Sequence, residues 1–154
     1  MKKRLFITLI FALTFSVFST KAQDYATQSD AVFKGSPNVA TFIFYRGGAF
    51  GQAFVNFTIR ANGDELCRLS NGRFMVYKAT PQKITFTNVA GGLNIPDKEN
   101  LEIDAEAGKV YYVQCDVKVN LFTNKMEMSE VTESTAKKKL KNVTADNCMK
   151  NMKE

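Results

Sequence analysis

The chain has no histidine among its 154 residues. This absence excludes Ser-His-Asp and Cys-His catalysis by its own side chains, and it removes the commonest catalytic metal ligand. A glycine-rich phosphate loop followed by Lys-Ser or Lys-Thr is also missing, and the pairs Gly47-Gly48 and Gly91-Gly92 are explained by turn geometry. We therefore expect a protein that is not an enzyme and that has neither a cofactor nor a bound metal ion.

The N-terminal region lacks an apolar run long enough to cross a membrane. Residues 5–18 form an apolar run of 14 residues, whereas a spanning helix needs about 20. Because a basic stretch precedes this run and small residues end it, residues 1–22 are predicted to be a signal peptide cut between Ala22 and Gln23. We expect export to the periplasm or the extracellular space, a soluble product and no stable transmembrane anchor.

Excess positive charge is largely a property of this leader. The full chain has 21 basic and 15 acidic residues, and removal of the leader takes away four basic residues and no acidic one. The remaining 132 residues carry 17 basic and 15 acidic side chains, a net charge of only +2. Such a weak balance does not favour a nucleic-acid partner, and a chain of this length can bury the core of one domain.

Cysteine is scarce, and none of the three residues stands at the predicted cleavage point, where a lipoprotein would carry its lipid. In an oxidising compartment Cys67 and Cys115 can pair, which would leave Cys148 free in the tail. The alternative is that Cys115 is a small buried hydrophobe, because alternation along residues 110–119 places it on an apolar face. Disulfides are not required for a domain of this size.

Short alternating segments predict an all-β fold after a polar lead-in at residues 23–37. Residues 39–46 are apolar on both faces, which is typical of a central strand, and residues 54–61 alternate between a buried and a wet face. Asn62-Gly63 predicts a hairpin turn. Further strands are expected at residues 65–69, 73–79, 83–89, 101–106, 110–119 and 125–131, with a hairpin between the segments 101–106 and 110–119.

The C-terminal part changes to helical periodicity. Thr132 is a plausible N-cap, and apolar residues at helical spacing predict a helix over about 133–143 that closes a domain of residues 38–143. Its lysine run is interpreted as a solvated face, with electrostatic contact to an anionic lipid or polymer as the alternative. Residues 144–154 carry no strong pattern and are expected to fray.

Two places are candidate binding sites. Tyr45 and Arg46 end the first core strand beside two glycines and could form an edge for stacking and anion binding; the alternative is that Tyr45 packs while Arg46 covers it and extends its charge to water. The second place is the long loop after Gly91-Gly92, where variable function is commonest. Its candidate residues are Asn94, Asp97, Lys98 and Glu99, for which a solvated loop is the simpler interpretation because their spacing matches no calcium loop.

Several segments resemble bacterial domain-of-unknown-function family 2846. They are Tyr45-Arg46, Asn62-Gly63, Asn71-Gly72-Arg73-Phe74 and the run from Ala107 to Val113, and the resemblance covers residues 38–142. It implies an exported protein, frequently a lipoprotein, with a small β-sandwich similar to immunoglobulin-like or regulatory carboxypeptidase-like modules. The chain departs from the family in lacking the lipid-bearing cysteine and in reading Thr80-Pro81-Gln82-Lys83 where a Pro-Gly turn and a histidine are expected.

Together these features leave two classes of function. The leading hypothesis is a noncatalytic exported antiparallel β-sandwich, with one C-terminal helix, that binds a protein or glycan partner at the bacterial cell envelope. The alternative is an exported hydrolase that uses carboxylates, which requires two acids converging in one pocket.

Overall fold

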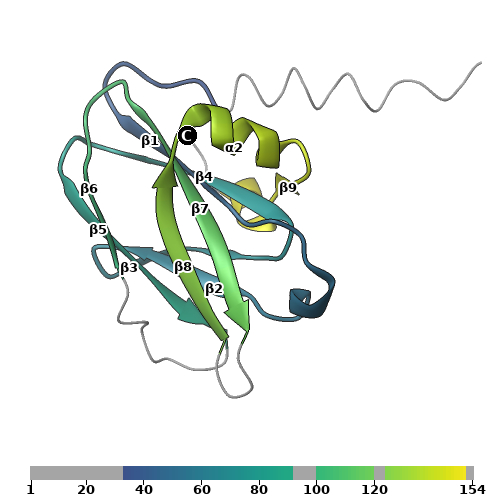
Figure 1. The fold of residues 1–154 in the computed structure, drawn as a ribbon. Coiled ribbons are helices and arrows are strands. Elements are labelled where there is room, and N and C mark those ends of the chain that lie inside the picture. The colour runs from purple at the N-terminus through teal and green to yellow at the C-terminus, as the bar shows by residue number, and fades with distance from the viewer. Residues whose placement is uncertain (1–32, 92–99, 120–123, 152–154) are drawn as a thin grey trace, which may run out of the picture. The chain divides into compact units, whose positions relative to one another are not determined.

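The described part of the protein is an all-β sandwich with one α-helix (Figure 1). The computed structural model describes residues 33–91, 100–119 and 124–151, and the statements below concern these residues. The predicted signal peptide, with its cleavage between Ala22 and Gln23, lies outside them. Two sheets face each other and enclose the main core.

The strands divide between a five-stranded and a four-stranded sheet. The first contains β1 (Ala40–Tyr45), β4 (Arg73–Ala79), β7 (Val110–Val119), β8 (Asn124–Val131) and β9 (Thr144–Ala145), in the order β8-β7-β1-β4-β9. The second contains β2 (Phe57–Ala61), β3 (Asp64–Leu69), β5 (Lys83–Ala90) and β6 (Leu101–Asp104), in the order β3-β2-β5-β6. Most pairings are antiparallel, while β1–β7 and β4–β9 are parallel.

Strand β1 is the centre of the five-stranded sheet, as its two apolar faces predicted. All six residues are buried. Phe42 and Phe44 lie in the core between the sheets, where the ring centroids of Phe42 and Tyr111 stack 4.9 Å apart and both phenylalanines form T-shaped pairs with Phe86. Ile43, on the opposite face, is also buried. A strand with both faces covered needs this continuous hydrophobicity.

The predicted hairpin at Asn62-Gly63 is confirmed. Strands β2 and β3 pair in antiparallel fashion, and both turn residues have positive φ angles, 51° for Asn62 and 94° for Gly63. This geometry is that of a two-residue turn, which these residue types adopt at little cost. The alternation in β2 is also confirmed, since Phe57, Ile59 and Ala61 are buried while the residues between them are partly exposed.

The predicted hairpin between residues 101–106 and 110–119 is wrong. Strand β6 pairs with β5 in the four-stranded sheet, whereas β7 pairs with β1 and β8 in the other sheet. The turn at Gly108 therefore carries the chain from one sheet to the other. A short turn between two alternating segments does not distinguish a hairpin from such a crossover, because the choice depends on which neighbours complete each sheet.

The helix α2 (Glu133–Leu140) confirms the predicted change of period. The Thr132 side chain accepts a hydrogen bond from the Thr135 backbone N–H, which makes it the N-cap. Ala136 and Leu140 are buried, and the lysines between them are exposed. Across the described residues, no helix has the length and apolar character needed to span a membrane.

Residues 144–151, which the structure describes, do not fray as predicted. Strand β9 pairs with β4, with Arg73 opposite Thr144 and Phe74 opposite Ala145. A 3-10 helix, η2 (Asn147–Asn151), follows it. The Asp146 backbone N–H donates to the Phe74 carbonyl at 2.8 Å, and the Arg73 side chain donates to the Thr144 hydroxyl. The tail lacks a sequence pattern because these contacts are specific rather than periodic.

Candidate functional site

Tyr45 and Arg46 do not form the predicted exposed edge. The Tyr45 side chain is buried, and its hydroxyl donates to the Gln114 Oε1 atom at 2.9 Å. Arg46 is 1% exposed, so its charge is not extended to water as the alternative interpretation supposed. Its guanidinium lies over the Phe57 ring, 5.5 Å from the ring centroid. A ligand outside the protein cannot stack on or bind to either side chain.

Arg46 instead holds the loop that follows it. This segment, residues 47–55, contains the 3-10 helix η1 (Phe50–Gln52) and is called the η1 loop below. One Arg46 amino group donates to the Val55 carbonyl, and the other donates to the Gln52 carbonyl at 3.0 Å. Burial lowers the pKa of the guanidinium from its usual value. Arg46 makes no ion pair with a described carboxylate; its two amino groups bond to loop carbonyls, and its buried Nε has no hydrogen-bond partner among the described residues.

Two amide side chains fix the same loop to the turn between β3 and β4 and to strand β7. Asn71 accepts from the Ala49 backbone N–H and donates to the Ala49 carbonyl, both at 3.1 Å. Gln52 donates to the Val117 carbonyl at 3.0 Å, which ties the loop to β7. With Arg46, the η1 loop has three polar anchors, and all of them bond to backbone atoms. This arrangement fixes the path of a segment that contains no regular strand.

The outer surface of the η1 loop is apolar. Phe50 is 101% exposed and Phe54 is 98% exposed, and they are the large hydrophobic side chains left in water among the described residues. The exposed positions of the loop are occupied only by glycine, alanine and phenylalanine, namely Gly47, Gly48, Ala49, Phe50, Gly51, Ala53 and Phe54. Figure 1 shows the loop's dark blue turn projecting from the sandwich beside the strands. Exposed hydrophobic surface of this kind marks interaction sites.

Sequence reasoning missed this loop, although a signal was present. Residues 54–61 were assigned to one strand, but β2 begins at Phe57 and Phe54 is exposed. The stretch from Gly47 to Ile59 contains no charged residue, and Ala-Phe occurs in it twice, at residues 49–50 and 53–54. A charge-free stretch beside two glycines could have been identified as a surface loop with apolar tips.

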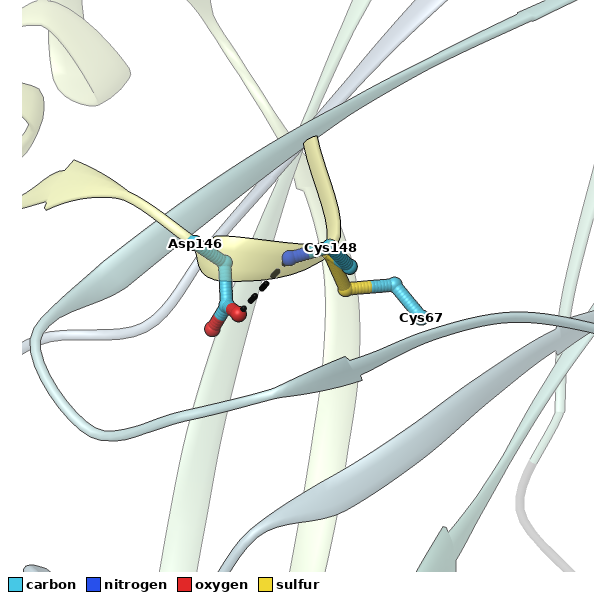
Figure 2. Close-up of side chains that lie close together, drawn as sticks. All are labelled: Cys67, Asp146 and Cys148. Carbon is cyan, nitrogen blue, oxygen red and sulfur yellow. Dashed lines mark hydrogen bonds between the residues drawn. A yellow bond between two sulfur atoms is a disulfide. The ribbon is translucent and has the colours of Figure 1, made fainter. Parts of the chain in front are cut away.

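The predicted disulfide between Cys67 and Cys115 is wrong, and so is the prediction that Cys148 is free. Cys67 of β3 is bonded to Cys148 of η2, with a Cα–Cα distance of 5.8 Å (Figure 2). The pairing of β9 with β4 brings η2 to β3, whereas Cys115 lies on β7 in the other sheet. Cys115 is a buried free thiol, as the alternative interpretation proposed, and burial raises its pKa far above the ordinary value.

Asp146 lies beside this disulfide. Its side chain is 5% exposed, and its two oxygens accept hydrogen bonds from the Ser70 N–H at 2.8 Å and the Cys148 N–H at 3.4 Å. The carboxylate and the two sulfur atoms lie within 4.8 Å of one another (Figure 2). These three residues are called the Cys67–Asp146–Cys148 cluster below.

Other acidic groups in the described residues lie in water. Asp146 is their one buried carboxylate. Glu102 and Glu127 pair with Lys83 and Lys118 on exposed strand surfaces, at 2.7 Å and 2.6 Å. The predicted binding loop with Asn94, Asp97, Lys98 and Glu99 lies outside the described residues.

Comparison with known proteins identifies no relative: the chain matches no family model, no curated protein and no solved structure.

Proposed function

We propose that the chain is a noncatalytic exported β-sandwich module that binds a partner protein at the bacterial cell envelope through the η1 loop. The observation that carries this proposal is the pair Phe50 and Phe54, fully exposed at the surface of an anchored loop. Burying one such side chain is worth about 1.5–3 kcal/mol. Folding does not bury these two rings, so a partner that covers both of them gains the free energy of their burial.

The anchors of the loop favour binding in the conformation already present. Arg46 is buried at a desolvation cost, and its guanidinium bonds to two loop carbonyls rather than to a carboxylate. Asn71 and Gln52 add bonds from outside the loop and from within it. A surface that is ordered before binding loses less conformational entropy on association. The fold thus uses one buried and two partly buried polar side chains to hold an apolar surface in water.

The chemistry of the exposed loop favours a protein over a glycan. Recognition of a polar ligand requires several placed hydrogen-bonding groups. The loop's outer positions carry no polar side chain, and Gln52 and Asn71 already bond to backbone. Aromatic side chains are enriched in the buried centres of protein interfaces. A partner with an apolar depression is therefore the best complement.

Export and family membership are part of the proposal and rest on the sequence. The basic start and short apolar run of residues 1–22 support a secretory signal peptide, and the missing cysteine at its end supports a product without a lipid. The resemblance to domain-of-unknown-function family 2846 rests on its strand-end and turn motifs. An N-terminal sequence of the secreted product beginning at Gln23 would support the leader, and a chain that stays in the cytoplasm would contradict it.

Site-specific cross-linking in intact cells tests the binding proposal. A photo-reactive amino acid at Ala53, an exposed position between the two phenylalanines, should give a discrete cross-linked protein product. The same probe in a chain that also carries Phe50→Ser and Phe54→Ser should lose most of that product. The probe at Thr80, an exposed residue outside the loop, is the matched control and should not give it.

Three results would contradict the proposal. They are no product from the probe at Ala53, the same product from the probe at Thr80, and an unchanged product in the double serine variant. A product that contains lipid or glycan instead of protein would also overturn the choice of partner. Identical thermal unfolding of the variants shows that a lost product does not come from a lost fold.

A further inference from the structure

Asp146 is a buried carboxylate without a described cation beside it. No salt bridge joins it to a described lysine or arginine, and its oxygens bond to two backbone N–H groups. Buried charges in proteins are generally paired or coordinate a metal ion. The sulfur atoms of Cys67 and Cys148 lie within 4.8 Å of its carboxylate. In the disulfide form these sulfurs are weak acceptors and supply no positive charge.

The thiol form of the same cluster has the composition of a zinc site. Two thiolates and a carboxylate are ligands that Zn²⁺ takes in tetrahedral geometry, at about 2.3 Å for sulfur and about 2.0–2.2 Å for oxygen. Such bond lengths put the ligand atoms roughly 3.5–4 Å apart. In the disulfide form a carboxylate oxygen of Asp146 lies within 4.8 Å of both bonded sulfurs, so it is within reach of an ion placed between the separated thiolates. Opening the disulfide requires the two sulfurs to separate, and Cys148 lies on a short helix next to the described end of the chain.

The backbone contacts of Asp146 fit a ligand role. Metal-binding carboxylates are usually held by further hydrogen bonds, which orient the oxygen that reaches the metal. The Ser70 and Cys148 N–H groups provide this orientation, and they leave lone pairs on both oxygens. Cys148 is only partly buried, which gives an ion a route to the sulfurs. Thiolate ligands select soft metal ions, so Zn²⁺ is favoured over Ca²⁺ or Mg²⁺.

The geometry points to a zinc site at the Cys67–Asp146–Cys148 cluster in the thiol form of the chain. Binding releases two thiol protons to water as two Zn–S bonds form, and the Asp146 carboxylate supplies the third protein ligand. A water molecule is the expected fourth ligand. The ion then ties η2 to β3 at the place where the disulfide ties them in the oxidised form. The disulfide and the zinc site exclude each other, because thiolates bound to zinc are not free to be oxidised to the disulfide.

Zinc titration of the reduced protein tests this inference independently of the η1 loop. A trialkylphosphine reduces the disulfide, which gains two electrons and two protons while the phosphine becomes a phosphine oxide with oxygen from water. The reduced chain should then take one equivalent of Zn²⁺ from a chromophoric chelator. Co²⁺ should give thiolate-to-metal charge-transfer absorption, and Zn²⁺ should raise the thermal midpoint of the reduced chain.

Variants separate this site from other thiols. Asp146→Asn should weaken zinc binding at least tenfold, on the order of the loss found when the surroundings of a metal site are altered. Cys67→Ser should abolish binding, whereas Cys115→Ala should retain it, because that buried thiol lies on β7. Equal binding by the oxidised chain, by Cys67→Ser or by Asp146→Asn would overturn the inference. So would a reduced chain whose thermal midpoint does not respond to Zn²⁺.

Discussion

The η1 loop and the C-terminal segment, residues 144–151, are both attached to the sandwich, but by different means. The C-terminal segment is held by a covalent bond, by the short strand β9 and by the buried Asp146. The η1 loop has no strand pairing and no covalent tie. It is held by side chains of Arg46, Asn71 and Gln52 that bond to backbone.

The two segments differ in which of their side chains are packed on the protein and which are exposed to water. Cys148 and Met149 pack against the core, so the C-terminal segment covers the body of the protein. In the η1 loop the anchoring side chains bond to backbone, while the large apolar side chains, Phe50 and Phe54, face water. We infer that the first segment serves stability, whereas the second serves recognition. Each of the following predictions tests this division, beginning with the largest expected effect.

Removal of the Cys67–Cys148 disulfide should have the largest effect on stability. The bond closes a sequence separation of 81 residues, for which the entropy of the unfolded chain predicts a loss of about 4.5 kcal/mol. Urea unfolding of the Cys67→Ala, Cys148→Ala double variant in metal-free buffer measures this loss of unfolding free energy. A loss below about 1 kcal/mol would show that β9 and Asp146 hold the segment without the covalent bond.

Arg46→Met should have the next largest effect, because it removes the donors to Val55 and Gln52 while keeping an apolar stem. Carbonyls left without a partner cost about 1–3 kcal/mol each, so a loss of roughly 2 kcal/mol is expected after partial hydration. Chymotrypsin should also cut faster after Phe50 and Phe54. Arg60→Met, on the partly exposed face of β2, is the matched control. Equal proteolysis of both variants would show that Arg46 does not hold the loop.

The sequence predicted the sandwich well because its strands follow local alternation. Phe57, Ile59 and Ala61 face the core as their spacing indicates, and β4 and β7 have the predicted bounds. The pairing of strands was harder to predict. The turn at Gly108 joins different sheets, because β7 finds its partner in β1, about 70 residues earlier in the chain.

Alkaline pH should destabilise the fold at Tyr45, which ends β1 just before the η1 loop. Burial raises the pKa of Tyr45 to about 12 from 10.0, so its neutral form is favoured in the folded state. This stabilisation is complete below pH 10 and is lost as the pH rises from 10 to 12, by on the order of 1–2 kcal/mol. Burial also raises the pKa of Tyr112, which adds to the same slope. Tyr45→Phe should therefore reduce, but not abolish, the fall in unfolding free energy between these pH values; an unchanged slope would contradict the assignment.

The candidate sites were less predictable than the fold because they depend on contacts between distant segments. Cys67 pairs with Cys148 only because β9 docks on β4, and a strand of two residues is too short to show a periodic pattern in the sequence. Arg46 was expected to reach water, but its partners are carbonyls of a loop whose path cannot be read from side-chain types. Exposure of Phe50 and Phe54 contradicts the ordinary preference of phenylalanine for the core.

Substitution of the exposed phenylalanines should have the smallest effect on stability and is the sharpest test of the division. Phe50→Ser with Phe54→Ser should change the unfolding free energy by no more than about 0.5 kcal/mol, because neither ring is covered in the folded protein. Phe57→Ala, three residues after Phe54 but fully buried, should cost about 3–5 kcal/mol. Urea unfolding measures the unfolding free energy of each of these variants. A loss above about 1 kcal/mol in the serine variant would mean that the rings pack on the protein's own body, and the loop would then resemble the C-terminal segment after all.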